Sequence, residues 1–192
     1  MDIGFIGTGI MGAPMAQHLA RAGHRLTLLD LDAAAAQRLA DTLGARVARS
    51  PREVAQASEV VITMLPNGQV VQQVALGDDG LVHGLRPGAL LLDTSSCEPW
   101  LTEQTGAALR ERGATMVDAP VSGAQWGAID AKLVFMVGGA TEDVARVRPL
   151  LDAMGRAVFH LGPLGAGHAM KCINNCITAV TLANTAEGLV AG

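Results

Sequence analysis

The chain is 192 residues long, has a formal net charge of −4 and contains 49% hydrophobic and 17% charged residues. The acidic balance excludes a general binder of the nucleic-acid backbone, and 3% aromatic residues without a tyrosine leave no platform for stacked bases. Three cysteines form no paired framework, there is no basic leader, and the apolar tail falls short of the ~20 residues of a membrane span. We therefore predict a cytoplasmic protein with no metal, no membrane segment and no nucleic-acid partner.

Short apolar segments alternate with helical patterns along the chain. Strands are predicted at residues 3–6, 25–29, 59–65, 89–93, 115–119, 133–138 and 157–161, with helices at 10–22, at 33–43 and between most later strands. Nearly unbroken apolar strands, each followed by a helix, are typical of a parallel sheet that is covered on both faces. The sequence therefore predicts an α/β fold with a doubly wound, mainly parallel Rossmann-type sheet.

The segment LGPLGAG at 161–167 ends the last predicted strand with glycines and a proline. One long helical pattern then runs to the end of the chain. We expect a domain boundary near Leu164, with a dinucleotide-binding domain at 1–164 and the first helix of a second, all-helical domain at 165–192.

The segment GTGIMG follows the first predicted strand and begins a helix. Its spacing is G-x-G-x-x-G: Gly7 permits a tight turn, Gly9 permits close approach to a pyrophosphate, and Gly12 permits close helix packing. The backbone N–H groups of the helix start, including those of Ile10 and Met11, are expected to face the phosphates. The alternative is a structural turn without a ligand.

Asp30 ends the second predicted strand, roughly 20 residues after the glycines, where an acidic side chain bonds the ribose 2′-OH. A carboxylate at this position repels the 2′-phosphate of NADP, and no arginine follows at once. The sequence therefore predicts NAD as the cofactor, with NADP less favoured. Asp32 is predicted to cap the next helix.

Two further loops, TMLPN (63–67) and DTSSCEP (93–99), follow the carboxyl ends of strands, where ligands of open α/β sheets bind. Ser95 is also expected near the nicotinamide or its ribose. The alternative for the two serines is capping of the helix that begins at Pro99. The predicted cofactor contacts in these loops are Leu65, Pro66, Asn67 and Ser96.

The segment DAPVSGAQWGA (118–128) places Ser122 and Gly123 in a loop, where a hydroxyl and backbone N–H groups form a nest suited to a carboxylate. The alternative is a glycine-containing loop with a capping serine.

The segment GAGHAMKCINNC (165–176) brings Lys171, Asn174 and Asn175 to one face of a predicted helix. Its apolar residues, with Ile177 and Val180 further on, are expected to pack on the opposite side. A solvated polar face is one interpretation. The other is a lysine among apolar neighbours, whose pKa falls far enough for proton exchange near neutral pH.

In this order, GFIGTGIMGAPMAQHL, DAPVSGAQWGA and GAGHAMKCINN resemble the signatures of the β-hydroxyacid dehydrogenase family, of the 3-hydroxyisobutyrate dehydrogenase and tartronate semialdehyde reductase type. The resemblance implies an oxidoreductase that transfers a hydride between NAD and a small 3-hydroxy acid. Lys171 would be the general acid and base, and Asn175 would act with it on the substrate. The resemblance also implies that the substrate is bound by Ser122, Gly123 and Asn174, and that Ser96 lies near the nicotinamide.

The chain departs from the family pattern in two ways. Ala124 replaces a second glycine, AKL at 131–133 replaces Gly-Thr-Leu, and Trp126 is bulky, which leaves the substrate open among 3-hydroxyisobutyrate, tartronate semialdehyde, 4-hydroxybutyrate and glyoxylate. Family members also continue into an all-helical domain that closes the site and mediates dimerisation. The alternative is thus a non-catalytic dinucleotide-binding fragment, and we expect self-association through the last helix. An imine-reducing enzyme is disfavoured by the intact Lys-x-x-Asn-Asn.

Overall fold

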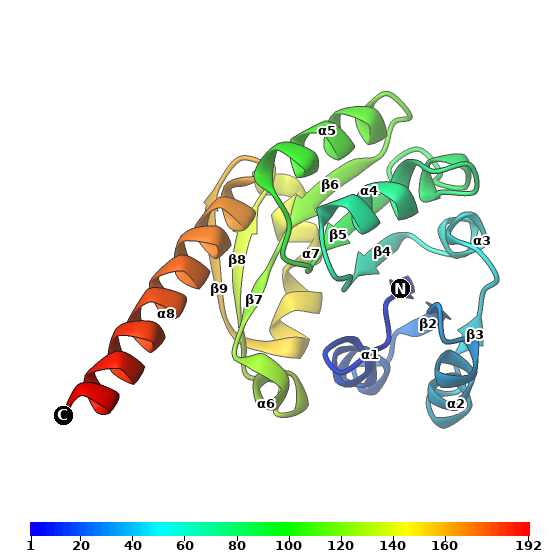
Figure 1. Cartoon of the computed structure of the whole chain (residues 1–192). Coiled ribbons are helices and arrows are strands. Elements are labelled where there is room, and N and C mark those ends of the chain that lie inside the picture. Colours follow the sequence, from blue (N-terminus) through cyan, green and yellow to red (C-terminus); the bar gives the residue numbers. More distant parts are fainter.

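A nine-stranded sheet forms the centre of the computed structural model, which describes residues 1–192 (Figure 1). The strands are β1 (Asp2–Ile6), β2 (Arg25–Leu29), β3 (Arg46–Val47), β4 (Val60–Thr63), β5 (Leu90–Asp93), β6 (Thr115–Asp118), β7 (Val121–Ser122), β8 (Leu133–Gly138) and β9 (Gly155–Gly162). The helices are α1 (Gly12–Arg21), α2 (Ala33–Leu43), α3 (Pro51–Gln56), α4 (Gly68–Leu76), the 3-10 helix η1 (Leu81–His83), α5 (Pro99–Arg110), α6 (Ala124–Ile129), α7 (Thr141–Met154) and α8 (Ala166–Ala191).

The strand order is β3-β2-β1-β4-β5-β6-β8-β7, with β9 paired to β8. The first six strands in this order are parallel. The chain reverses its direction of winding beside β1, whose neighbours are β2 and β4. In open α/β sheets such a reversal marks the crevice outside the carboxyl ends of the strands where ligands bind. The predicted α/β fold with a doubly wound, mainly parallel sheet is confirmed.

The far edge of the sheet differs from this parallel pattern. β8 is antiparallel to β6 and β7, while β9 runs parallel to β8. All seven predicted strands are present, with ends that differ by at most two residues, whereas β3 and β7 were not predicted. Each of these two strands has only two residues, too few to show an alternating pattern, and each exists through its pairing with a longer neighbour.

The core consists of two apolar layers, one on each face of the sheet. In β4, Val60 and Ile62 join a cluster of 23 buried residues, while Val61 joins a second cluster of 11 on the other face. This division follows from the alternation of side chains along a strand. A sheet buried on both faces is rigid, so the loops at its carboxyl edge have fixed starting points.

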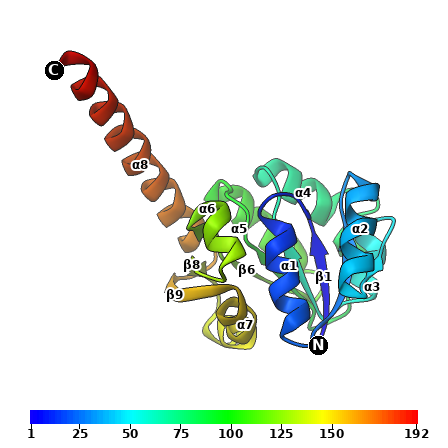
Figure 2. The ribbon, with the colours of Figure 1, turned by 90° about the horizontal axis from the view of Figure 1, so that it is seen from below.

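Helix α8 leaves the body of the domain after its first turns and projects away from it (Figures 1 and 2). Gly167 and His168 are buried, whereas the apolar side that was predicted to pack is exposed, with 54% of Ile173, 62% of Ile177 and 53% of Val180 accessible. Within this chain that side packs against nothing, because no other element lies against the distal part of α8. Although α8 has 26 residues, no helix is both long and apolar enough to cross a membrane.

The first turn of α8 is seated so closely that residue 167 must be glycine. A Cβ on Gly167 would meet the backbone oxygen of Met136 and lie 2.8 Å from Asp118 Oδ2, whereas one on Gly188 meets nothing within 4 Å. We expect Gly167→Ala to lower the free energy of unfolding in urea by about 1–3 kcal/mol. The matched control Gly188→Ala should leave it unchanged or raise it by up to about 1 kcal/mol. Equal effects of the two substitutions would contradict this packing.

Candidate active site

The glycine-rich loop lies between β1 and α1, at the carboxyl edge of the sheet. Gly7 has φ +93, and a Cβ there would meet the backbone oxygen of Met64, while one on Gly12 would meet the oxygen of Gly7. A Cβ on Gly9 meets nothing within 4 Å, so open space lies over this residue. The backbone N–H groups of Ile10 and Met11 have no acceptor within the protein. The loop thus has the open surface and free donors that a pyrophosphate requires.

Asp30 follows β2 and holds the glycine-rich loop. Its Oδ2 accepts hydrogen bonds from Thr8 N at 2.6 Å and Thr8 Oγ1 at 3.1 Å, and its Oδ1 accepts one from Asp32 N at 3.0 Å. The carboxylate is therefore fixed at the rim of the crevice. Asp32 Oδ1 accepts from Ala35 N at 2.9 Å, so the predicted cap of α2 is confirmed.

The loops after β4 and β5 are joined by a hydrogen bond. Leu65 N donates to Ser95 Oγ at 2.9 Å, and Ser95 N donates to Asp93 Oδ1 at 3.0 Å. Asn67 caps α4 by accepting a hydrogen bond from Val70 N, and Pro66 lies between Leu65 and Asn67 in the loop after β4. Neither serine caps α5, whose first flanking residue is Glu98. Ser95 is buried and used structurally, whereas the neighbouring Ser96 is exposed at the edge of the crevice.

The Ser122–Gly123 segment joins β7 to α6. Gly123 has φ +124, and Ala124 has φ 50, in the left-handed region that favours glycine. Ala124 thus keeps a backbone conformation suited to the glycine of the family pattern. Ser122 and Gly123 line a pocket of about 280 Å³ together with Trp126, Lys132 and Arg156 among others.

Lys171 lies in the second turn of α8 and is half-buried. Burial lowers the pKa of its amine, because the charged form is disfavoured away from water. The amine makes no hydrogen bond or ion pair within the chain. Asn174 is partly buried and its Nδ2 donates to Asn175 Oδ1 at 3.5 Å, while Asn175 is exposed. The i, i+4 spacing keeps Lys171 and Asn175 on one side of the helix.

A buried polar cluster lies beneath the start of α8, and sequence reasoning missed it. Asp93, Asp118 and His168 are all fully buried, and Thr102 Oγ1 lies 2.8 Å from His168 Nδ1. Burial raises the pKa of Asp118, while the nearby His168 and two backbone N–H groups act in the opposite direction. The only sequence signal was their position: Asp118 opens one signature segment and His168 lies within another.

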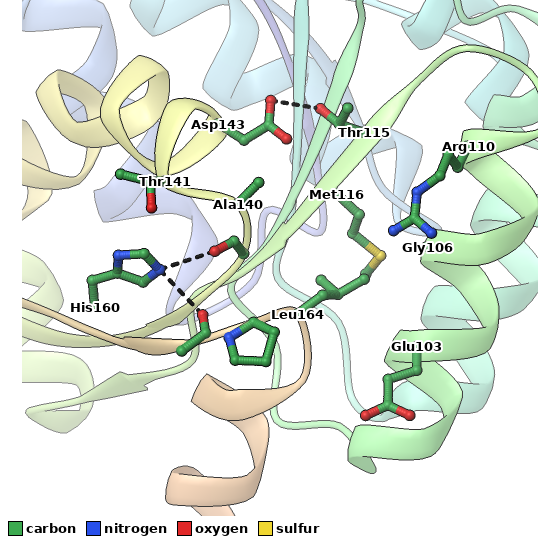
Figure 3. A pocket seen from close by; sticks show the side chains of 13 residues that line it. Glu103, Gly106, Arg110, Thr115, Met116, Ala140, Thr141, Asp143, His160 and Leu164 are labelled. Carbon is green, nitrogen blue, oxygen red and sulfur yellow. Dashed lines mark hydrogen bonds between the residues drawn. The ribbon is translucent and has the colours of Figure 1, made fainter.

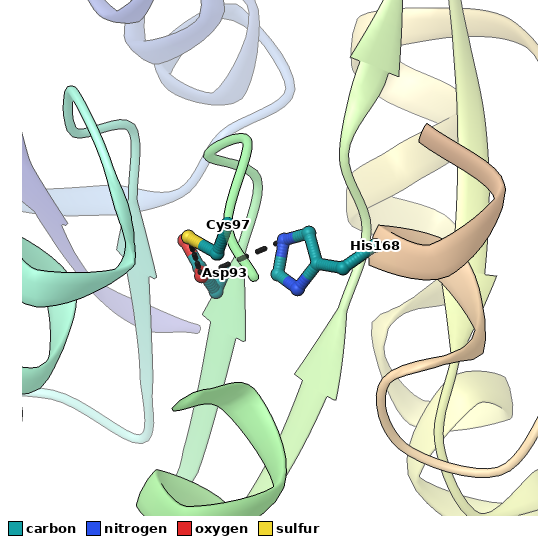
Figure 4. Close-up of side chains that lie close together, drawn as sticks. All are labelled: Asp93, Cys97 and His168. Carbon is teal, nitrogen blue, oxygen red and sulfur yellow. Dashed lines mark hydrogen bonds and ion pairs between the residues drawn. The ribbon is translucent and has the colours of Figure 1, made fainter. Parts of the chain in front are cut away.

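Three residues of this region, Asp93, Cys97 and His168, have potential metal-ligand atoms within 4.8 Å of one another (Figure 4). Cys97 Sγ, however, donates to Asp93 Oδ2 at 3.2 Å, and both ring nitrogens of His168 have partners. Burial and the adjacent Asp93 raise the pKa of the Cys97 thiol well above its ordinary value, which disfavours a thiolate ligand. The donor set therefore suits internal hydrogen bonding better than a metal.

A pocket of about 840 Å³ lies between α5, β6, α7 and the end of β9 (Figure 3). Asp143 accepts a hydrogen bond from Thr115 there, and His160 Nε2 lies near the backbone oxygens of Gly139 and Gly162. None of the residues predicted for the cofactor or the substrate lines this pocket. It is therefore separate from the crevice at the carboxyl edge of the parallel strands.

The chain is similar to known dehydrogenases in both sequence and structure. The NAD-binding domain of 6-phosphogluconate dehydrogenase matches residues 2–162. An NAD-dependent L-serine dehydrogenase of Pseudomonas aeruginosa is 47% identical over 100% of this chain and 64% of its own length, and a 3-hydroxyisobutyrate dehydrogenase of the same organism is 44% identical with the same coverage. The solved structure of Mycobacterium tuberculosis 3-hydroxyisobutyrate dehydrogenase with L-serine has a TM-score of 0.92 at 39% identity, over 98% of this chain and 64% of that one.

The chain thus spans 64% of the length of these curated relatives. The matches run through the glycine-rich loop, the Ser122–Gly123 segment and the start of α8. The relatives are named as dehydrogenases, one of them as NAD-dependent, and the prediction of NAD as the cofactor agrees with the matched NAD-binding domain. The chain belongs to the 3-hydroxyisobutyrate dehydrogenase family of oxidoreductases and carries its NAD-binding domain.

Proposed function

We propose that this chain forms the cofactor-binding part, with the proton-transferring lysine, of a dehydrogenase that oxidises a small 3-hydroxy acid with NAD. The observation that carries the proposal is a half-buried lysine with a lowered pKa and no partner within the chain, on a helix that starts at the edge of an NAD-binding sheet. A neutral amine is needed to accept a hydroxyl proton, and burial increases its population at a given pH.

The residue roles follow from this arrangement. NAD, when bound along the glycine-rich loop, supplies the hydride acceptor. Lys171 Nζ takes the proton of the substrate hydroxyl as the hydride leaves the carbon that bears this hydroxyl. In the reverse reaction Lys171 returns the proton to the oxygen. Asn175 acts beside Lys171 on the same face of α8. Ser122 and Gly123, with Asn174, bind the substrate and its carboxylate.

The binding of NAD is assigned to the loops at the carboxyl edge of the sheet. The free N–H groups of the glycine-rich loop fit the pyrophosphate, and the carboxylate of Asp30 fits the ribose hydroxyls and disfavours a 2′-phosphate. The exposed Ser96 is assigned to the nicotinamide end. The other assigned contacts are Leu65, Pro66 and Asn67.

The substrate class follows from shared chemistry. Two relatives are named for 3-hydroxyisobutyrate and L-serine, and both molecules carry a hydroxyl on the third carbon of a carboxylic acid. We propose that class for this chain. Ala124 and Trp126 distinguish its loop from the family pattern, so the individual substrate is not assigned.

The second candidate is a dinucleotide-binding module that requires further helices or a partner for turnover. The exposed apolar residues of α8 favour it, because a site beside an uncovered helix admits water, which weakens the electrostatic interactions there.

The three free cysteines agree with a reducing compartment, and the cytoplasmic location stays a prediction.

Lys171→Ala tests the proposed function. We expect it to lower kcat by about 10²–10⁴, because general acid–base catalysis is lost, while NADH affinity measured by fluorescence titration persists. Small 3-hydroxy acids and semialdehydes would be screened with NADH or NAD and with NADPH or NADP, using Arg148→Ala, a change of an exposed cation on α7 that lines neither pocket, as the control. Unchanged turnover in Lys171→Ala excludes the assigned role, NADH binding without any turnover supports the second candidate, and a preference for NADPH contradicts the reading of Asp30.

The pKa of Lys171 can be measured without turnover. Lys132 and Lys171 are the only lysines, so a chain labelled with ¹³C at lysine Cε gives two signals, and Lys132→Arg leaves that of Lys171. We expect Lys171 to titrate below its ordinary value of 10.5. Since the unfolded chain binds more protons between the two pKa values, the free energy of unfolding should rise with pH in that window. Titration at or above 10.5 would remove the basis for the proton-transfer role.

We also propose that the chain self-associates through α8. Ile173, Ile177 and Val180 are spaced by four and three residues, form one stripe and are each more than half exposed. Sedimentation velocity should show a dimer or larger species that Ile177→Lys disrupts, whereas Thr178→Lys on the other face leaves it intact. A monomer at all concentrations, or equal effects of both variants, would refute this interface.

A further inference from the structure

The start of α8 is capped by a carboxylate from a distant strand. Gly165, the residue before the helix, offers no side chain, and instead Gly165 N donates to Asp118 Oδ1 and His168 N to Asp118 Oδ2, both at 2.7 Å. Asp118 thus satisfies two of the N–H groups that a helix start leaves unpaired, and its negative charge faces the positive end of the helix dipole. These bonds fix both the position and the direction of the first turn.

The side chain of His168 attaches the same turn to two other elements. Its Nε2 lies 3.1 Å from the backbone oxygen of Ser95, and its Nδ1 lies 2.8 Å from Thr102 Oγ1 of α5. A carbonyl oxygen only accepts, so Nε2 carries a hydrogen, while Nδ1 pairs with the Thr102 hydroxyl, which also lies 3.3 Å from the backbone oxygen of Glu98. Every polar atom of this fully buried ring is paired, which favours one orientation.

Ser95 extends the connection to the cofactor side. Its Oγ accepts from Leu65 N at 2.9 Å, and it precedes the exposed Ser96. Ser95, in the loop after β5, therefore contacts both the loop after β4 and the ring of His168. Lys171 follows His168 by three residues, less than one turn of helix. A shift in the position of His168 therefore moves the backbone of Lys171 as well.

We propose that Asp118 and His168 are positioning residues that hold Lys171 in register with the loops after β4 and β5, through Ser95. The proposal rests on the function assigned to Lys171. Beyond Asn174 all of α8 is exposed, so the anchored first turns set where the lysine points. Misplacement of a reacting group by about 1 Å can cost about 10² in rate.

His168→Leu keeps the approximate volume of the side chain and removes both ring hydrogen bonds. Thr102→Val removes the partner of Nδ1 and leaves the Nε2 bond to Ser95 in place, and His168→Gln retains an amide donor for Ser95. We expect kcat of His168→Leu to fall about 10²-fold while the dissociation constant of NADH changes less than about threefold, with partial recovery in His168→Gln. In the lysine-labelled chain, the titration of Lys171 should move toward 10.5 in His168→Leu and Thr102→Val, because the side chain gains access to water.

The outcomes separate this inference from the proposed function. Folded His168→Leu and Thr102→Val chains with wild-type kcat and an unmoved Lys171 titration overturn the positioning role, even if Lys171→Ala is inactive. Equal losses of kcat and NADH affinity in His168→Leu also overturn it, since they indicate a general structural role. Activity in Lys171→Ala overturns the proposed function itself. If the wild-type chain shows no turnover, the titration is read together with hydrogen exchange at residues 166–175, which is expected to rise in His168→Leu and Thr102→Val. An unmoved Lys171 titration with unchanged exchange then overturns the positioning role.

Discussion

The hydrogen bonds from Gly165 N and His168 N to the carboxylate of Asp118 join the parallel sheet to the helix that carries Lys171. Burying that carboxylate is costly, and the raised pKa of Asp118 is the sign of this cost. Two backbone donors and the N-terminal end of α8 offset it. Because a buried acceptor without partners is unfavourable, the structure has a strong reason to keep the start of α8 in this one place.

Absent side chains are as important to this arrangement as the polar ones. A Cβ on Gly138 would meet Asp118 Oδ1 and the oxygen of Pro163, and a Cβ on Gly167 would meet the oxygen of Met136. The same constraint acts at the other end of the crevice, where Gly7 and Gly12 admit neighbouring backbone. Both the cofactor loop and the α8 junction therefore depend on backbone approaching backbone more closely than any other residue permits.

The parts of the structure that sequence predicted are those encoded locally. Apolar strands, the glycine spacing and the cap at Asp32 each depend on residues a few positions apart. The pairs that hold α8 are separated by 47 residues for Gly165 and Asp118, and by 73 for His168 and Ser95, so no periodicity reveals them. Whether Lys171 is solvated or half-buried also depends on which turns of α8 lie against the sheet, and the exposure of Ile177 shows how far that contact extends.

Two histidines connect the elements that carry Ser122, Gly123 and Lys171 to the loops at the carboxyl edge of the sheet. His168 connects α8 to the loop after β5, and His18 of α1 donates from Nε2 to the backbone oxygens of Ala128 and Ile129, at the end of α6. The helix that follows the glycine-rich loop thus fixes the helix that follows Ser122 and Gly123. The backbone placement of α6 and α8 relative to the glycine-rich loop is set within this chain. What further helices or a second copy would add is cover for α8 and exclusion of water, which strengthens electrostatic interactions without having to create the arrangement.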